Sequence, residues 1–147
     1  MWIVKPGENS NRGNGITVSY SLDDIIIRLK GRERNSDGKL RTFIVQQYIE
    51  RPFLYNRRKF DIRHYLLVTC MNGSIKGYWY EEGYIRTSSY EFTLKFCKDP
   101  LVHLTNDAIQ KNCENYGRFE KGNKLSYSDF QKYLDSSLNN KSGKEKK

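Results

Sequence analysis

The sequence predicts a single α+β domain, or a piece of one, in which an antiparallel sheet is flanked by helices. Residues 42–86 alternate strand-like segments with turn residues, and helix-compatible segments lie on both sides of this block. The 147 residues, 37% hydrophobic and 14% aromatic, suffice for one compact core. This aromatic content excludes wholesale disorder, because disordered chains lack such residues.

The chain opens on an apolar strand that runs into a glycine-rich loop. Because Trp2-Ile-Val-Lys-Pro6 resembles the middle of a buried strand, we expect the domain to be truncated at its N-terminus. The glycines of residues 7–15 can adopt positive φ, as in a loop that is mobile or clasps a ligand. Residues 19–29 then predict a short amphipathic helix, and the charged residues 30–41 predict a surface excursion.

An antiparallel meander is expected in the middle of the chain. Its segments are rich in β-branched and aromatic residues, which favour strands. Met71-Asn-Gly-Ser74 supplies a hairpin turn, and Glu81-Glu-Gly83 supplies another. The predicted strands cover residues 42–49, 59–69, 75–80 and 84–86.

Helices are expected again after Pro100. Residues 103–114 are helix-compatible, and a final helix should begin at Ser126, because Ser126 and Asp129 fit a capping box before apolar residues. Residues 139–147 contain no apolar side chain and predict a disordered basic tail. The folded domain is therefore expected over residues 1–138.

Composition limits the classes of partner. There are 26 basic and 17 acidic residues, and the net charge of +9 predicts an acidic partner: nucleic acid, a membrane face, a phosphorylated ligand or an acidic protein tail. No apolar run approaches the roughly 20 residues of a membrane-spanning helix. Cys70, Cys97 and Cys113 show neither disulfide nor zinc spacing, so we expect a soluble, unexported protein in a reducing compartment.

The most informative segment is the strand that begins near Lys59. Strand alternation places Lys59, Asp61 and Arg63 on one face and apolar residues on the other. These charges are either a solvent-facing strip of ion pairs or part of a site for a polyphosphate and an amino acid. Lys5 favours the second interpretation, because it directly precedes the glycine-rich loop, where an ammonium and backbone N–H groups can meet phosphate oxygens.

Six blocks together resemble, in order and spacing, the tubulin tyrosine ligase family of ATP-grasp enzymes. The resemblance covers residues 2 to about 138 and implies an ATP-grasp core that forms a peptide bond through an acylphosphate. The blocks are Trp2–Pro6, Arg12–Ile16, Gln46–Ile49, Lys59–Arg63, Tyr84–Ser89 and His103–Asn106.

The resemblance also implies roles for individual residues. Residues in contact with ATP would comprise phosphate ligands, a covering loop, a hinge beside adenine and a motif beside the nucleotide: Lys5, Lys59, Arg12, Gly13, Gly15, Ile16, Gln46, Gln47, Tyr48, Ile49, Thr105 and Asn106. Catalytic residues would be Asp61, Arg63 and Arg86. Substrate contacts would come from Arg86, Thr87 and Ser88.

The implied cofactors are ATP and Mg²⁺, and the implied partners are a free amino acid and the acidic C-terminal tail of tubulin, without nucleic acid or membrane insertion. The family's magnesium ligands lie beyond the final helix and are absent from this sequence, so we expect a fragment or an incomplete gene model with weak ATP binding and little catalysis. The location would be the cytoplasm and cytoskeleton, with the cilium as a further site.

The blocks Arg86–Ser89 and Ile109–Lys111 favour tyrosine as the added amino acid. The resemblance leaves glycine and glutamate open. A catalytically inactive tubulin-binding fragment is a further alternative, because the magnesium ligands are missing. Nucleic-acid binding would explain the charge but not the six ordered blocks.

Overall fold

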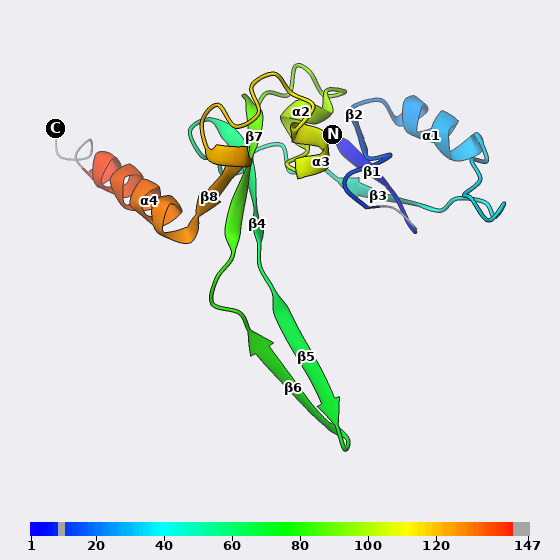
Figure 1. The fold of residues 1–147 in the computed structure, drawn as a ribbon. Helices are drawn as coiled ribbons and strands as arrows, with labels where there is room; N and C mark the ends of the chain where they lie inside the picture. The colour runs from blue at the N-terminus through cyan, green and yellow to red at the C-terminus, as the bar shows by residue number, and fades with distance from the viewer. Residues whose placement is uncertain (9–10, 143–147) are drawn as a thin grey trace.

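The computed structural model describes residues 1–8 and 11–142, folded into two small antiparallel sheets, a projecting hairpin and peripheral helices (Figure 1). The predicted α+β class is confirmed. No helix among the described residues is long and apolar enough to cross a membrane.

The first sheet has the strand order β2-β1-β3, with β1 (Trp2–Pro6) between β2 (Thr17–Ser19) and β3 (Phe43–Gln47). The prediction that residues 42–49 belong to the central meander is wrong, because β3 pairs with β1 along its whole length. An apolar partner strand was already present at the N-terminus, and β3 joins it there.

Helix α1 (Leu22–Lys30) packs beside this sheet, close to its predicted position. It begins where the Ser21 hydroxyl accepts a hydrogen bond from the Asp24 N–H at 3.1 Å. Its buried residue Ile25 contributes to an apolar core with Val4 of β1 and Val18 of β2.

The second sheet has the order β4-β7-β8, formed by β4 (Arg58–Arg63), β7 (Tyr84–Glu91) and β8 (Lys124–Ser126). Strand β7 is longer than the expected residues 84–86, because its second half is buried and hydrogen-bonded. The three-residue strand β8 was not predicted, since so short a segment carries no detectable alternation.

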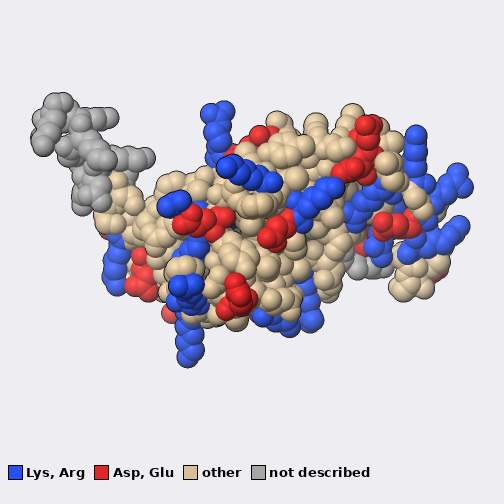
Figure 2. Space-filling model, turned by 90° about the horizontal axis from the view of Figure 1, so that it is seen from above, with Lys and Arg blue, Asp and Glu red and all other residues tan. Residues whose placement is uncertain are grey.

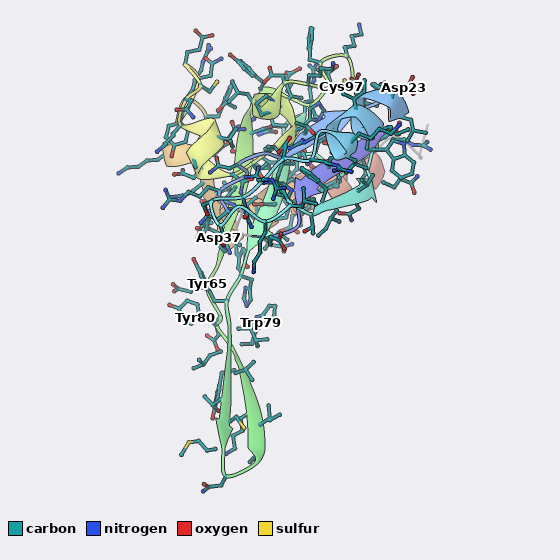
Figure 3. The ribbon with its side chains drawn as sticks, turned by 90° about the vertical axis from the view of Figure 1, so that its right-hand side faces the viewer. Asp23, Asp37, Tyr65, Trp79, Tyr80 and Cys97 are labelled. Atoms are coloured by element: carbon teal, nitrogen blue, oxygen red, sulfur yellow. The ribbon has the colours of Figure 1, made fainter. Side chains whose placement is uncertain are left out.

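The predicted continuous strand over residues 59–69 is wrong. The pairing of β4 ends at Arg63, and the chain resumes as β5 (Leu66–Met71), which pairs only with β6 (Ser74–Trp79). The expected turn is confirmed, with positive φ at Asn72 and Gly73. Strands β5 and β6 project away from the body, and Figure 3 shows Tyr65, Trp79 and Tyr80 near the base of this projection.

The predicted helix over residues 103–114 is wrong in extent, because α3 (Asp107–Gln110) covers only part of it and α2 (Pro100–His103) ends where it was expected to begin. Residue Leu104 ends α2 in an extended conformation. A short 3₁₀ helix, η1 (Lys121–Asn123), precedes β8. Residues 104–106 therefore lie between α2 and α3 and are not part of a helix.

The final helix is α4 (Tyr127–Ser142), and its predicted capping box is present. The Ser126 hydroxyl accepts from the Asp129 N–H at 3.0 Å and donates to the Asp129 carboxylate at 2.8 Å. Predicted disorder is wrong for residues 139–142, whose backbone continues α4. Residues 143–147 of the predicted tail lie outside the described residues.

Candidate anion and phosphoryl-transfer site

Strand β4 separates an apolar face from a charged one, as its alternation predicts. Phe60 packs against Phe130 of α4, with 4.9 Å between ring centroids, and against Phe53 at 6.0 Å. Lys59 and Asp61 point to the opposite side, where they meet β7 and the segment after α2. Helix α4 thus covers the apolar face of β4 and leaves the charged face for a site.

Lys59 is held by a chain of three polar groups. Its ammonium donates to the Tyr48 hydroxyl at 3.0 Å and to the His103 carbonyl at 2.8 Å. The Tyr48 hydroxyl lies 2.8 Å from Nδ1 of His103, and Nε2 of His103 lies 3.2 Å from the carbonyl of Phe96. Since that carbonyl can only accept, Nε2 carries the proton and Nδ1 accepts from Tyr48.

Burial is the main cause of two pKa changes in this chain of contacts. It lowers the pKa of Lys59, with the nearby Asp61 raising it and Lys5 lowering it further. Burial likewise lowers the pKa of His103. A neutral His103 suits its role as acceptor from Tyr48, so the network positions Lys59 without adding a second charge.

The ammonium groups of Lys5 and Lys59 lie near each other. Lys5 of β1 donates to the side-chain oxygen of Gln46 of β3 at 2.8 Å, and its charge is close enough to lower the pKa of Lys59. Each of these hydrogen bonds goes to a neutral acceptor, and an ammonium has three N–H donors. Neither lysine forms an ion pair within the described residues, and both keep spare donors, as an anion such as a phosphate group requires.

Asp61 and Arg86 face each other across β4 and β7 as register partners. The guanidinium binds both carboxylate oxygens, with Nε 2.7 Å from Oδ1 and Nη2 bonded to Oδ2. The hydrogen bond that Arg86 donates to Asp61 is the largest contribution raising the pKa of Arg86. Asp61 thereby orients Arg86 in a fixed plane.

A cationic cavity of about 500 Å³ lies beside this pair and collects residues from four separate predicted blocks. The side chains of Arg12, Arg63 and Lys111 form no hydrogen bond or ion pair with any other residue in the described part of the chain. A surplus of unpaired cations favours an anionic ligand. The lining residues are Asn11, Arg12, Arg63, Arg86, Asn106, Asp107, Ala108 and Lys111.

The glycine-rich loop closes one side of this cavity. Gly13 has a φ of +85°, and a Cβ atom there would lie 3.0 Å from Oδ1 of Asn106. Arg12 also has positive φ, at 59°. Close approach of the loop to Asn106 therefore requires glycine at position 13, and it delivers the Arg12 side chain to the cavity.

The remaining predicted cofactor residues are more dispersed. Ile16 lines a separate cavity of about 180 Å³, together with His103. Thr105 is buried, whereas Gln47 and Ile49 are exposed at and just after the end of β3. The structure thus brings Lys5, Lys59, Gln46 and Tyr48 into one cluster and Arg12, Arg63, Arg86 and Asn106 into another.

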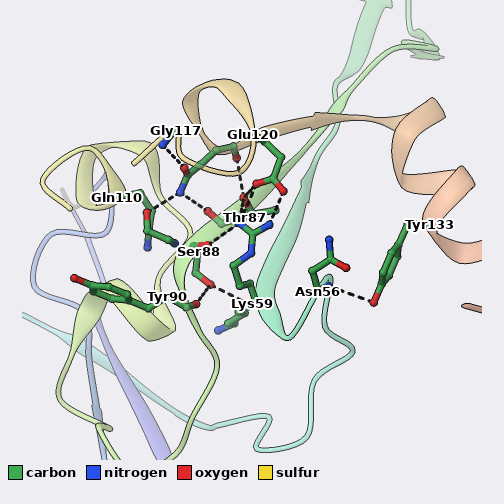
Figure 4. A network of polar contacts seen from close by, with 12 residues as sticks. Asn56, Lys59, Thr87, Ser88, Tyr90, Gln110, Gly117, Glu120 and Tyr133 are labelled. Carbon is green, nitrogen blue, oxygen red and sulfur yellow. Dashed lines mark hydrogen bonds and ion pairs between the residues drawn. The ribbon is translucent and has the colours of Figure 1, made fainter. Parts of the chain in front are cut away.

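The predicted substrate residues Thr87 and Ser88 are fully buried in β7. The Thr87 hydroxyl donates to Glu120 at 2.9 Å, and the Ser88 hydroxyl donates to the Tyr90 carbonyl at 2.8 Å (Figure 4). Their hydroxyls therefore serve the fold in this structure, and among the predicted substrate residues only Arg86 reaches the cavity.

A buried polar network behind β7 was missed by sequence reasoning. Arg58 forms a two-point ion pair with Glu120, and Asn123 and Gln110 satisfy backbone groups of β7 and α2 (Figure 4). These residues anchor the segment carrying α2, α3 and η1 to the sheet. Arg58 is the residue that could have pointed to this network. Once Arg58 is known to be buried, it needs a carboxylate partner.

Comparison with known proteins decides the family. The tubulin-tyrosine ligase family profile matches residues 1–146. The chain belongs to this family. It is 41% identical over 138 residues to tubulin glycylase 3B of Drosophila melanogaster and 43% identical over 116 residues to tubulin monoglycylase TTLL3 of Homo sapiens. It is 32% identical over 162 residues to the probable tubulin polyglutamylase TTLL9 of Mus musculus.

These matches cover most of this chain and a small part of each relative. They include 91%, 78% and 90% of the chain, in the order given, but 17%, 14% and 34% of the respective relatives. The expected family is confirmed. The preference for tyrosine is not confirmed, and the names of these relatives fit the alternative of glycine or glutamate better.

The two expected cofactors differ in how they fit the described residues. The cations and spare N–H donors of Lys5, Lys59 and Arg12 fit the phosphates of ATP. Within residues 1–8 and 11–142, no cluster of three histidine, cysteine, aspartate or glutamate side chains could hold a metal ion. Of the carboxylates near the cationic cavity, Asp61 has both oxygens bound by Arg86.

Proposed function

We propose that this chain forms part of an ATP-dependent ligase that joins an amino acid to tubulin, with glycine as the favoured amino acid. The observation that carries the proposal is the cationic cavity, where Arg12, Arg63, Arg86 and Asn106 converge from four distant segments. The names of the relatives support both the tubulin substrate and the choice of glycine.

The chemistry is an acyl activation. ATP transfers its terminal phosphoryl group to a carboxylate, which gives an acylphosphate and ADP, and an amine then displaces phosphate to form the peptide bond. Lys5 and Lys59 would hold the phosphates of ATP. Arg63 and Arg86 would offset negative charge on the transferring phosphoryl group and the carboxylate, and Asp61 would hold Arg86 in position.

The sequence blocks that favoured tyrosine give no support to that choice over glycine. The two blocks that favoured tyrosine contain Thr87, Ser88 and Gln110, and all three side chains are buried in contacts within the fold. Such residues maintain the sheet and do not contact the amino acid in this structure. Their presence therefore does not discriminate between amino acids.

The substrate surface is proposed to be the acidic C-terminal tail of tubulin, in the cytoplasm and at the cytoskeleton, including the cilium. The net charge of +9 is complementary to such a tail. A catalytically inactive tubulin-binding fragment would use the same charges, so the two proposals differ in their use of ATP.

The test offers tubulin, ATP, Mg²⁺ and labelled glycine, tyrosine or glutamate, in separate reactions, to a full-length ligase that contains this chain. We expect glycine to be incorporated in excess of the other two, and Arg63→Ala to abolish incorporation. The control Arg57→Ala removes an exposed arginine that pairs with Glu91 away from the cavity, and should have no effect. Predominant tyrosine or glutamate incorporation contradicts the choice of glycine, and tubulin binding without ATP consumption supports the inactive fragment.

A further inference from the structure

Residues 28–41, named here the basic hairpin, comprise the last residues of α1 and the ordered turn that follows it. Arg34 and Leu40 form a β-bridge, and the Arg41 N–H donates to the Glu33 carbonyl at 2.7 Å. At the tip, the side-chain oxygen of Asn35 accepts from the N–H groups of Asp37 and Lys39 at 3.2 and 3.0 Å. The charges of this segment are therefore displayed on a defined backbone.

The basic hairpin carries a large share of the positive charge. Six of its 14 residues are basic and two are acidic, which gives it +4 of the chain's net +9. Lys30, Arg32 and Lys39 are exposed, and their side chains have no ion-pair partner within the described residues. Figure 2 shows basic side chains gathered at the right-hand end of the molecule, where α1 and this hairpin lie in Figure 1.

A polar cavity of about 240 Å³ connects the basic hairpin to the glycine-rich loop. Asn35, Ser36 and Arg41 line it from the hairpin, and Asn11 and Asn14 line it from the loop. Asparagine amides donate and accept hydrogen bonds, as the groups of a peptide backbone do. Glu8 also lines this cavity and is its acidic residue.

Asn11 lines both this cavity and the 500 Å³ cationic cavity. The two spaces therefore adjoin at the loop that carries Arg12. Together, these two cavities place amides of Asn11, Asn14 and Asn35 between the basic hairpin and the cations at Arg12 and Arg63.

We propose that these residues form a path that is the docking surface of an acidic peptide: glutamate side chains pair with the basic hairpin, and the peptide passes Asn11 to present one carboxylate in the cationic cavity. This inference rests on the proposed function for the identity of the reaction, and it assigns the entry route of the acceptor. Charge complementarity on such a surface governs the encounter rate and the orientation of the partner.

The test measures binding of a short fluorescent glutamate-rich peptide to the full chain at low ionic strength. The double variant Arg32→Glu/Lys39→Glu reverses two exposed charges of the hairpin. The matched control Lys76→Glu/Lys121→Glu makes the same change in net charge on β6 and η1, away from the path. We expect about a tenfold loss of affinity in the hairpin variant and less than about a twofold loss in the control.

Equal losses in the two variants, or no loss in either, would overturn the assignment, because binding would then follow net charge alone or lie elsewhere. An oligonucleotide of similar charge that binds the hairpin while the peptide does not would also overturn it, in favour of nucleic acid. Circular dichroism of each variant confirms that the fold is retained. Amide chemical-shift changes at Asn35, Asn11 and Arg63 on peptide addition would confirm the direction of the path.

ATP binding to the same variants separates this inference from the proposed function. If the hairpin variant loses peptide binding and keeps ATP binding, the docking surface holds and the nucleotide site is independent of it. If ATP binds and the peptide does not, the docking inference fails while the proposed function stands. If the peptide binds along the path but ATP does not bind, the docking surface holds and the ligase proposal fails.

Discussion

At the scale of single residues, the site depends on how buried polar groups satisfy one another. The Tyr48 hydroxyl is used twice, as acceptor from Lys59 and as donor to His103, and Tyr48 is only 6% exposed. Burial also raises the pKa of Tyr48, so the hydroxyl keeps its proton and remains a donor. The neutral Tyr48 side chain thus positions the Lys59 ammonium, which we assign to phosphate binding.

Tyr48→Phe should therefore lower the free energy of unfolding by about 1–3 kcal/mol, because it leaves a buried nitrogen of His103 without a partner. Denaturant unfolding measures the change. The matched control is Tyr78→Phe on the projecting hairpin, where the tyrosine is 51% exposed and its loss should change stability little. Equal stability of Tyr48→Phe and the wild type would contradict the network.

His103 predicts a pH dependence of stability. Burial lowers the pKa of His103 in the folded state, so the unfolded chain binds the proton more tightly. The free energy of unfolding should then decrease as the pH falls below the ordinary histidine pKa of 6.5. Thermal unfolding across this range measures the effect, and His103→Gln should flatten it. An identical pH profile in the variant would refute this origin.

Individual residues differ in how far the sequence predicts them. Period-2 alternation places Lys59 and Asp61 correctly on one face of β4, since alternation is a local property of strands. The partnership of Tyr48 with His103 joins residues that are far apart in sequence, and no local pattern encodes it. For the same reason, the burial of Thr87 and Ser88 follows from Glu120 and Asn123, which reach β7 from another segment.

At the scale of elements, the glycine-rich loop packs closely against the segment before α3. Residues Gly13 and Gly38 both have positive φ, at +85° and +74°. Only at Gly13 would a Cβ atom press on a neighbour, the Asn106 side chain, whereas nothing lies within 4 Å of the corresponding atom at Gly38. Substitutions at Gly13 and Gly38 can therefore be compared to separate the effect of backbone strain from the effect of a lost close contact.

Gly13→Ala should weaken ligand binding in the cationic cavity, while Gly38→Ala should not. Both substitutions should destabilise the fold by about 1 kcal/mol through backbone strain. Titration of inorganic triphosphate monitored by calorimetry provides the binding comparison. Equal triphosphate affinity in the two variants would show that the loop does not shape the cavity.

Element boundaries show where local patterns are informative. The capping box located the start of α4, because the Ser126 hydroxyl accepts from the Asp129 N–H of the first turn and donates to the Asp129 carboxylate. The helix expected over residues 103–114 is interrupted because tertiary contacts hold its middle: the buried Gln110 side chain binds the carbonyls of Leu101 and Leu104. Propensity alone does not include such contacts.

At the scale of the whole molecule, the projecting hairpin of β5 and β6 exposes apolar side chains on both faces. A two-stranded ribbon is only marginally stable in water, and large exposed apolar patches promote association. His64 stacks on Trp79 at 3.5 Å between ring centroids and bonds the Tyr127 hydroxyl of α4 at 2.8 Å, which anchors the base of the hairpin. The exposed side chains include Leu66, Leu67, Val68, Met71, Ile75 and Trp79.

The hairpin should therefore cause self-association of the isolated chain. Val68→Thr/Ile75→Thr keeps β-branched side chains on the strands while removing apolar surface. We expect weaker binding of a hydrophobic dye and a shift of the sedimentation profile towards the monomer. The matched control is Thr69→Val, which adds apolar surface on the same strand and should have the opposite effect. Unchanged association in both variants would contradict this role.

The global assembly was the least predictable part of the fold. The sequence located strand-forming residues within 42–86, but it joined β4 and β5 into one strand. In the structure β3 pairs with β1, β4 pairs with β7, and β5 pairs with β6. Alternation shows which face of a strand is apolar but not which strand lies beside it. The ordered family blocks nevertheless identified the residues that converge from distant segments on the cationic cavity.

The most direct test of the central claim is ATP binding by this chain, measured by calorimetry with magnesium present. The wild type should bind, even if weakly, and Lys59→Ala should bind at least about tenfold less tightly, because it removes a phosphate-directed charge. Lys76→Ala removes an exposed lysine of β6 and should bind as the wild type does. Absence of ATP binding in a folded sample, or equal binding by Lys59→Ala, would contradict a nucleotide site at Lys5 and Lys59.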